Sequence, residues 1–187
     1  GNIIMKINYL KIVNFKYILV LEINNMENSL ILVGKNSTGK TSVIDAILIA
    51  AGLRQVYSHE FLDYSKPVEI SMQISLTDDD LNYYYTKGIL SKTRNYDKWL
   101  EEFKIKLPSF QDGIISFNCY INPGFSIHYR DGFHKNNQYI KQIIPKIYHI
   151  DQNRNLETLQ NDVFSFYDKQ SFKMLKDNQC TFDSERK

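Results

Sequence analysis

The sequence predicts an α/β protein with α+β character, in which a mixed sheet carries an antiparallel hairpin layer from the N-terminus. Residues 30–33 form a short apolar run that leads through a glycine-bearing loop into an apolar segment, which indicates a strand followed by a helix. Two apolar segments precede this unit, and strands separated by turn residues are indicated within 68–129. We therefore expect the strand ending at Val33 in the middle of the sheet, with the next helix packed on it and an antiparallel layer beside it.

The first elements along the chain follow from turn residues and apolar patterning. The segment Asn14-Phe15-Lys16 separates two apolar runs, and the asparagine-rich stretch 24–28 supplies a second reversal of the chain. The helix expected at 42–53 is apolar almost all round, apart from Ser42 and Asp45. Such a pattern is typical of a helix packed between layers.

The loop before this helix matches the phosphate-binding pattern G-x-x-x-x-G-K-[ST]. Its glycines allow the backbone to curl so that successive N–H groups point at phosphate oxygens, and the N-terminus of the helix adds partial positive charge. Lys40 is expected to reach the β- and γ-phosphates, and the Thr41 hydroxyl to bind Mg²⁺. The predicted nucleotide-binding residues are Gly34, Lys35, Asn36, Ser37, Thr38, Gly39, Lys40, Thr41 and Ser42.

The residues in and before the loop resemble one group of ATPases. Asn36 and Ser42 make the loop similar to G-x-N-[GS]-x-G-K-[ST]-[ST] of ABC-type ATPase heads, and less similar to the loop of small-molecule kinases. Residues 5–50, about a quarter of the chain, look like the opening of RecF, SMC and OLD-type P-loop ATPases. The resemblance implies the N-terminal lobe of an ABC-type head that binds ATP and Mg²⁺. It also implies a C-terminal lobe, a second ATPase head and DNA as partners of the full-length protein, in repair, chromosome handling or phage defence.

Two more residues are assigned to the nucleotide site by the same resemblance. Heads of this kind place a basic residue near the phosphates, and Lys16 in the hairpin turn matches it. They also use a glutamine at the end of a strand, which contacts Mg²⁺ and the γ-phosphate. Gln152 follows an expected strand and fits this role better than Gln73, which lies inside one. The alternative for Gln152 is an ordinary loop glutamine.

In the middle of the chain, the sequence predicts a strand followed by a helix. Residues 68–76 alternate as in a half-buried strand. Thr77 with Asp80 forms a capping-box pattern, so we interpret the aspartates at 78–80 as a helix start and not as a metal site. The tyrosines at 83–85 are interpreted as core residues and not as a base-stacking surface.

Further elements are expected toward the C-terminus. Residues 114–121 and 125–129 indicate a hairpin around Asn122-Pro123-Gly124, with another turn at Arg130-Asp131-Gly132. Residues 146–151 are expected to form a strand, and residues 156–176 an amphipathic helix.

The expected domains are an ATPase N-lobe at 1–155 and, at 156–187, the start of a truncated helical insertion. Residues 1–4 precede Met5 and are expected to be a cloning remnant or an alternative start.

The residues needed for hydrolysis are not evident. An acidic residue should end a buried strand to hold Mg²⁺, and a further group should position the attacking water. Glu22 lies before the loop in a hairpin strand, and the strand leading to Asp151 is interrupted by Lys146 and His149. No S-G-G signature occurs in the sequence. We therefore expect ATPase activity in the full-length protein, whereas this chain alone should bind ATP with little or no hydrolysis.

An alternative function stays open, that of a complete small P-loop kinase acting on a nucleotide or metabolite, with Asp151 as its Mg²⁺ ligand. Such kinases carry several arginines in a lid, but the arginines after Ala51 are scattered here. A GTPase is disfavoured because the N-K-x-D guanine motif is missing.

Composition sets the remaining expectations. With 187 residues, 43% of them hydrophobic and 24% charged, the chain can bury one core. The net charge of +2 is too mild to indicate nucleic-acid binding by itself. Cys119 and Cys180 are isolated and predict free thiols, and the four histidines show no metal-ligand spacing. Without a signal peptide or a long apolar run, a cytoplasmic protein with no membrane partner is expected.

Overall fold

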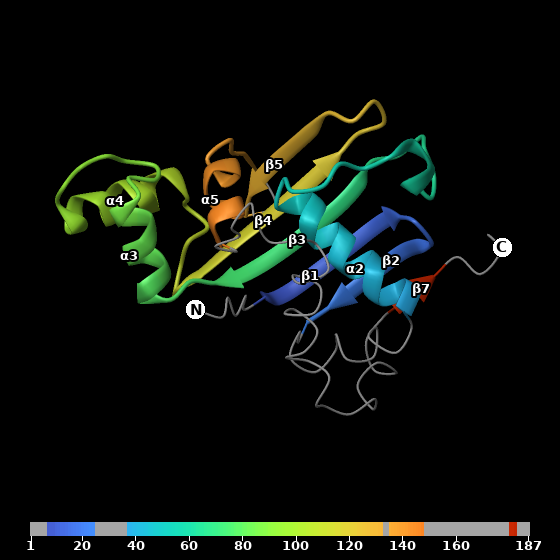
Figure 1. Ribbon diagram of the computed structural model, residues 1–187, viewed down its shortest axis with the longest axis horizontal. Coiled ribbons are helices and arrows are strands. Elements are labelled where there is room, and N and C mark those ends of the chain that lie inside the picture. The colour runs from blue at the N-terminus through green and yellow to red at the C-terminus, as the bar shows by residue number, and fades with distance from the viewer. Residues whose placement is uncertain (1–6, 25–36, 133–134, 148–179, 183–187) are drawn as a thin grey trace.

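A computed structural model of the chain describes residues 7–24, 37–132, 135–147 and 180–182 (Figure 1). The predicted strand at 30–33 and the predicted helix at 156–176 lie outside these residues. Strands β1 to β7 and the helices labelled α2 to α5 account for most of the described chain.

The strands form one sheet with the order β6-β5-β4-β3-β1-β2-β7. Every pairing in the described part of the chain is antiparallel, which confirms the antiparallel layer predicted from the hairpin and residues 68–129. A parallel strand ending at Val33 stays a prediction. The strands are β1 Ile7–Phe15, β2 Ile18–Ile23, β3 Val68–Ser75, β4 Ile114–Ile121, β5 Ile127–Asp131, β6 Lys135–Asn136 and β7 Cys180–Phe182.

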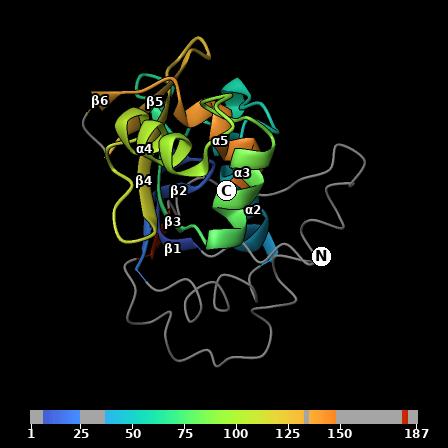
Figure 2. The same cartoon turned by 90° about the vertical axis from the view of Figure 1, so that its left-hand side faces the viewer.

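The alternation along the strands separates a buried face from a polar one. On β3, Val68, Ile70 and Ile74 are buried, whereas Glu69 and Gln73 between them are half-buried. Because successive side chains of a strand point to opposite faces, the apolar residues lie together under the helices. Figure 2 shows α2 and α3 on one side of the strands.

Helix α2 spans Ser37–Ala50, so the prediction of a helix over 42–53 was wrong at both ends. The second half of the glycine-bearing loop already has helical backbone. At the other end Gly52 adopts a φ of 75°, its N–H donates to the Ile49 carbonyl at 3.0 Å, and the Leu53 N–H donates to the Leu48 carbonyl at 2.9 Å. This pair of bonds is a Schellman motif, which ends the helix before Leu53.

Helices α3, Asp78–Thr86, and α4, Tyr96–Lys106, form an excursion between β3 and β4 at the left of Figure 1. The predicted capping box is confirmed, since the Asp80 N–H donates to the Thr77 hydroxyl and the Thr77 N–H to the Asp80 carboxylate. Tyr84 is fully buried and stacks on Phe103 of α4. The tyrosine run thus supplies core residues, as expected, although helix α4 itself was not predicted.

Helix α5, Ile140–Ile147, corrects the strand predicted at 146–151. Lys146 and Ile147 are helical, and the rest of that range lies outside the described residues. Isoleucines at 140, 143, 144 and 147 have the spacing of one helix face, and both Ile140 and Ile143 are fully buried. This longer-range periodicity outweighs the short apolar run on which the strand prediction rested.

The predicted hairpin is confirmed by β4 and β5, whose turn contains Gly124 with a φ of 92°. The next turn starts later than predicted, because Arg130 and Asp131 still belong to β5. Cys119 is a buried free thiol, as expected, and burial raises its pKa to about 12. The side chain of Cys180 lies outside the described set.

Strand β7 pairs with β2 and brings residues 180–182 back to the edge of the sheet. The expected domain boundary at residue 155 stays a prediction, because it falls outside the described residues. In the described part of the chain, no helix combines the length and the apolar character that crossing a bilayer requires.

Candidate functional site

The N-terminal end of α2 is the candidate site. Ser37, Thr38, Gly39 and Lys40 are described as helical backbone, while Gly34, Lys35 and Asn36 lie outside the described residues. The second half of the predicted loop is therefore the first turn of a helix. The first backbone N–H groups of a helix have no partner within it, and they carry the positive end of the helix dipole.

The composition of α2 fits a phosphate group at this end. Its first turn contains no acidic residue, so no carboxylate opposes an approaching anion there. Thr41 is exposed, and Ser42 is buried at 3% exposure. The role of Thr41 as a Mg²⁺ ligand stays a prediction. In the described ranges no cluster of three or more His, Cys, Asp or Glu residues could hold a metal.

Asp45, the acidic residue of α2, is held by two cations. Its Oδ2 lies 2.5 Å from the Nζ of Lys16, and its Oδ1 lies 3.6 Å from the Nε of Arg54. A carboxylate with 8% exposure needs such partners, because burying an unpaired charge is costly. Asp45 comes four residues after Thr41, so the two lie on the same face of the helix. Lys16 is therefore close to the middle of α2, since Asp45 is the ninth of the 14 helix residues.

Glu60 completes this ion network. It ends the short helix η1, Ser58–Glu60, and its two carboxylate oxygens accept bonds of 3.0 and 2.6 Å from Arg54. The Tyr57 N–H donates to Oε1 at 3.0 Å, and the Lys16 Nζ lies 3.9 Å from Oε2. We call Lys16, Asp45, Arg54 and Glu60 the ion quartet. It connects the β1–β2 turn, α2 and the segment after α2.

In the ion quartet, the combined effect of charges and hydrogen bonds on the pKa values of Glu60 and Arg54 is larger than the effect of burial. Burial alone would raise the pKa of Glu60, but the hydrogen bonds from Arg54 and Tyr57 and the charges of Arg54 and Lys16 hold it below its ordinary value. Burial alone would lower the pKa of Arg54, but its bond to Glu60 and the nearby charges of Asp45 and Glu60 leave it raised. Both groups therefore stay charged at neutral pH.

The turn that carries Lys16 is fixed by Asn14. Both residues have positive φ, 62° and 54°, a conformation that asparagine tolerates better than most residues. The Asn14 amide nitrogen donates to the carbonyls of Asp63, Lys66 and Pro67. Its oxygen accepts from the Asp63 N–H at 2.7 Å, and the Lys16 N–H donates to the Glu60 carbonyl at 2.6 Å. The predicted Asn14-Phe15-Lys16 turn is thus tied to the segment that supplies Glu60.

Of the other residues considered from sequence, the structure describes Glu22 but not Asp151 or Gln152. Glu22 alternates with the buried Leu21 and Ile23 and so lies on the sheet face away from α2. It accepts a bond of 3.0 Å from the Tyr9 hydroxyl, whose pKa burial and Glu22 raise to about 12. The structure therefore places Lys16 beside Asp45 of α2, and its contact with phosphate stays a prediction.

The fold of this chain is similar to that of a solved SMC ATPase structure. A structure described under "Structural biochemistry of ATP-driven dimerization and DNA stimulated activation of SMC ATPases" matches with a TM-score of 0.51 and 18% identity, over 92% of this chain and 98% of the other. The fold is that of the N-terminal lobe of an SMC-like ATPase head. This SMC-like lobe places α2, with the G-K-T residues in its first turns, on the antiparallel sheet.

Larger SMC structures resemble the lobe less closely. The Smc head domain of Pyrococcus furiosus with an extended coiled coil, bound to the C-terminal domain of ScpA, has a TM-score of 0.45 and 13% identity, over 77% of this chain and 33% of that one. A Smc head domain of Pyrococcus yayanosii has a TM-score of 0.46 and 14% identity, over 76% and 26% of the two chains. The SMC-like lobe thus spans about a third of the Pyrococcus furiosus structure. No protein-family model and no curated protein sequence matches this chain.

Sequence reasoning identified Lys16 but missed its partners. Asp45 was noted as one of two polar residues in an otherwise apolar helix, and a carboxylate in such a helix indicates a buried cation nearby. Arg54 and Glu60 carry no comparable local signal, because their pairing depends on how the segment after α2 folds back.

Proposed function

We propose that this chain is the ATP- and Mg²⁺-binding N-terminal lobe of a RecF, SMC or OLD-like ATPase, in a full-length cytoplasmic protein that works on DNA. The observation that carries the proposal is the first turn of α2. There the G-x-x-x-x-G-K-[ST] sequence runs into a helix N-terminus without acidic residues, on a sheet with the fold of an SMC-like head lobe. Helix N-termini of this kind bind phosphate through backbone N–H groups.

Each residue of the site has a distinct task in this proposal. The backbone N–H groups from Gly34 to Lys40 surround the phosphates, and the Lys40 ammonium neutralises charge on the β- and γ-phosphates. Thr41 supplies an oxygen ligand to Mg²⁺, which offsets phosphate charge when bound. The ion quartet keeps Asp45 neutralised by Lys16 and Arg54, so that the carboxylate does not repel the triphosphate. Gln152 is retained as a γ-phosphate contact by resemblance.

Hydrolysis is assigned to the full-length protein. Phosphoryl transfer requires an oriented water and charge stabilisation on the equatorial oxygens, beyond what a phosphate-binding loop supplies. We propose that these groups come from a C-terminal lobe and from a second head. The similar SMC ATPase structure concerns ATP-driven dimerization, which supports pairing of two heads.

A small kinase is the weaker interpretation. Such enzymes build on a doubly wound parallel sheet, whereas the described strands of this chain all pair antiparallel. No observation in the described residues favours an acceptor site for a metabolite.

The proposal predicts that Mg²⁺-ATP stabilises the chain through Lys40. At a hundred times its dissociation constant, the nucleotide should raise the free energy of unfolding by about 2.7 kcal/mol. Thermal unfolding with and without Mg²⁺-ATP measures this shift for wild type and Lys40→Ala. The variant should lose most of the shift because its phosphate contacts are reduced.

Lys66→Ala is the matched control. Lys66 is an exposed lysine in the loop before β3, and its replacement should leave the ATP-induced shift intact. Equal shifts for wild type and Lys40→Ala at saturating nucleotide would contradict the assignment of the site.

A further inference from the structure

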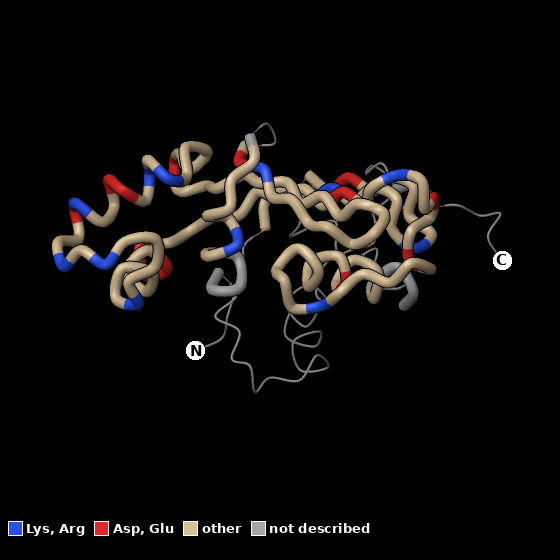
Figure 3. The backbone as a smooth tube through the Cα atoms, turned by 90° about the horizontal axis from the view of Figure 1, so that it is seen from above, with Lys and Arg blue, Asp and Glu red and all other residues tan. Residues whose placement is uncertain are grey.

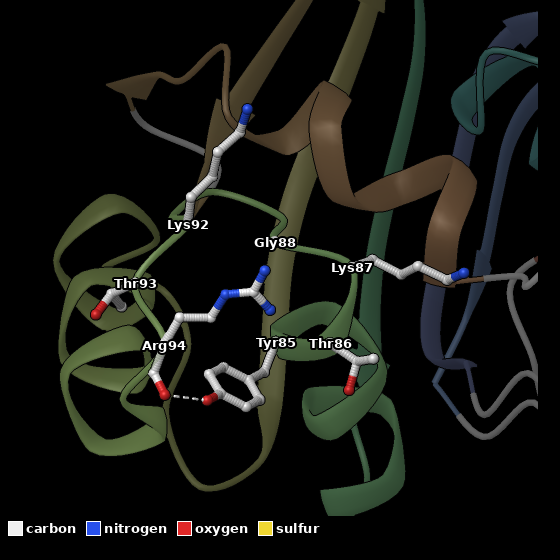
Figure 4. Close-up of a pocket in the computed structure, with 7 residues that line it drawn as sticks. All are labelled: Tyr85, Thr86, Lys87, Gly88, Lys92, Thr93 and Arg94. Carbon is white, nitrogen blue, oxygen red and sulfur yellow. Dashed lines mark hydrogen bonds between the residues drawn. The ribbon is translucent and has the colours of Figure 1, made fainter.

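The loop between α3 and α4 forms a second candidate site, apart from α2. It encloses an open pocket of about 310 Å³, lined in part by Tyr85, Lys87, Gly88, Lys92 and Arg94 (Figure 4). The lining residues belong to the α3–α4 excursion at the left of Figure 1, whereas α2 lies nearer the centre; Figure 3 shows basic and acidic residues together in this part of the backbone. Nothing in the proposed nucleotide site uses these residues.

The loop that lines the pocket is positively charged, although the helices on either side balance it, since residues 78–106 together contain six bases and six acids. The whole chain has 23 basic and 21 acidic residues, but between Asp80 and Asp97 it carries three bases and no acid. These bases are Lys87, Lys92 and Arg94, and all three are exposed. Within the described part of the chain, none of them lies within ion-pair distance of a carboxylate. Their positive charge is therefore available to an external anion.

The backbone that carries these charges is held in place by the aromatic core of the excursion. The Tyr85 hydroxyl donates to the Arg94 carbonyl at 2.5 Å, and the Trp99 indole N–H donates to the Ile89 carbonyl at 2.9 Å. Lys106 donates to the Leu90 carbonyl. Because Trp99 is fully buried, the loop is anchored to the core at its middle and at its end. Such anchoring lowers the entropy cost of ligand binding.

The directions of the three side chains indicate the shape of the ligand. In Figure 4 the Arg94 guanidinium turns toward Gly88, whereas Lys87 and Lys92 extend away from each other. Diverging cations suit successive charges along an extended polyanion better than one compact anion. The planar guanidinium can bind a phosphate with two parallel hydrogen bonds.

From these observations we infer that the α3–α4 loop is the surface on which this lobe binds the phosphodiester backbone of DNA. The inference rests on the proposed function in one respect, that the protein works on DNA, and it adds the place of contact. It does not depend on nucleotide binding at α2. Backbone contacts of this type carry no base specificity and weaken as salt rises.

The test is the affinity of the purified chain for a fluorescein-labelled DNA duplex, measured by anisotropy across a series of salt concentrations. Lys92→Glu with Arg94→Glu should lower the affinity roughly tenfold or more and reduce the salt slope by about 2, one for each lost phosphate contact. Both side chains are exposed, so circular dichroism and the melting temperature should match those of wild type.

A charge-matched control distinguishes DNA binding at the pocket from a general effect of the net charge on affinity. Lys66→Glu with Lys141→Glu changes the net charge by the same amount at exposed positions outside the pocket, so it should retain most of the affinity. Equal losses in the two double variants would overturn the inference. It would also be overturned if wild type bound no DNA, or if an acidic peptide bound the pocket in place of DNA.

Failure of this inference can be separated from failure of the nucleotide site. Lys40→Ala should lose the ATP-induced stabilisation but keep DNA binding. The double variant Lys92→Glu with Arg94→Glu should keep the ATP-induced stabilisation and lose DNA binding. If the double variant loses DNA binding while wild type shows no response to ATP, the inference stands and the nucleotide proposal fails.

Discussion

Glu60 shows how a single residue joins the parts of the candidate site. Its side chain is 4% exposed, yet both oxygens accept hydrogen bonds from Arg54, and one also accepts the Tyr57 N–H. Its backbone carbonyl accepts the Lys16 N–H at 2.6 Å. Removing one partner of a buried ion pair leaves the other charge uncompensated, which costs more than the pair contributes. Glu60 is thus expected to fix both Arg54 and the turn that presents Lys16.

Glu60→Gln should destabilise the chain by about 3 kcal/mol at pH 7, the low end for a broken buried pair, because Arg54 keeps some exposure to water. The effect should depend on pH. The pKa of Glu60 is lowered from its ordinary value of 4.5, so the folded state binds fewer protons than the unfolded state as pH falls below that value. Stability from Glu60 is therefore full above pH 4.5 and is lost as pH falls through the lowered pKa.

Urea unfolding of wild type and Glu60→Gln between neutral and acidic pH measures this dependence. The difference between the two proteins should shrink as pH falls below 4.5. Glu101→Gln, at an exposed position of α4, serves as the control and should give a small difference at every pH. A Glu60→Gln difference that stays constant through the acid range would contradict the assigned ion pairing.

At the scale of the element, the C-terminal end of α2 depends on Gly52. This residue has a φ of 75°, and a Cβ placed on it would meet no atom within 4 Å. Gly52→Ala should therefore cost only the strain of the left-handed backbone, about 1 kcal/mol, without a steric clash. Gly52→Asn should cost less, because asparagine tolerates this conformation. Urea unfolding compares the variants, and equal stability of all three proteins would contradict the Schellman motif.

Elements with local signals could be predicted from the sequence, whereas elements that depend on distant partners could not. Thr77 and Asp80 specify a helix start within four residues, and Asn122-Pro123-Gly124 specifies a hairpin turn. Helix α4 was missed although Trp99 and Phe103 have the spacing of one helix face, because their burial depends on contacts outside the helix, such as Tyr84 and Phe110. The end of α2 at Ala50 is decided by hydrogen bonds at Gly52, which the apolar pattern continuing to Leu53 conceals.

In the candidate site too, contiguous residues could be predicted from the sequence, whereas contacts between distant residues could not. The phosphate-binding motif is contiguous in sequence and could be recognised, but the ion quartet joins residues 16, 45, 54 and 60 from separate elements. The cations of the α3–α4 loop had a detectable signal, a stretch from 81 to 96 with three bases and no acid. The overall charge balance concealed that signal, because net charge averages over the whole chain.

At the scale of the whole molecule, the antiparallel sheet and the helices on its buried face form a lobe with two separate candidate sites. One is the N-terminus of α2, and the other is the loop between α3 and α4. Helix α2 packs on β1 and β3, next to the hairpin turn that carries Lys16. We propose that this lobe binds ATP and depends on a C-terminal lobe and a second head for hydrolysis.

A single-turnover experiment tests this claim most directly. The purified chain is mixed with a substoichiometric amount of radiolabelled Mg²⁺-ATP, and the bound nucleotide is separated and identified as ATP or ADP over time. Binding with the label retained as ATP is predicted, because the missing groups typically supply several powers of ten in rate. Absence of bound nucleotide, or its conversion at a rate near the enzyme median of roughly 10 per second, would contradict the account.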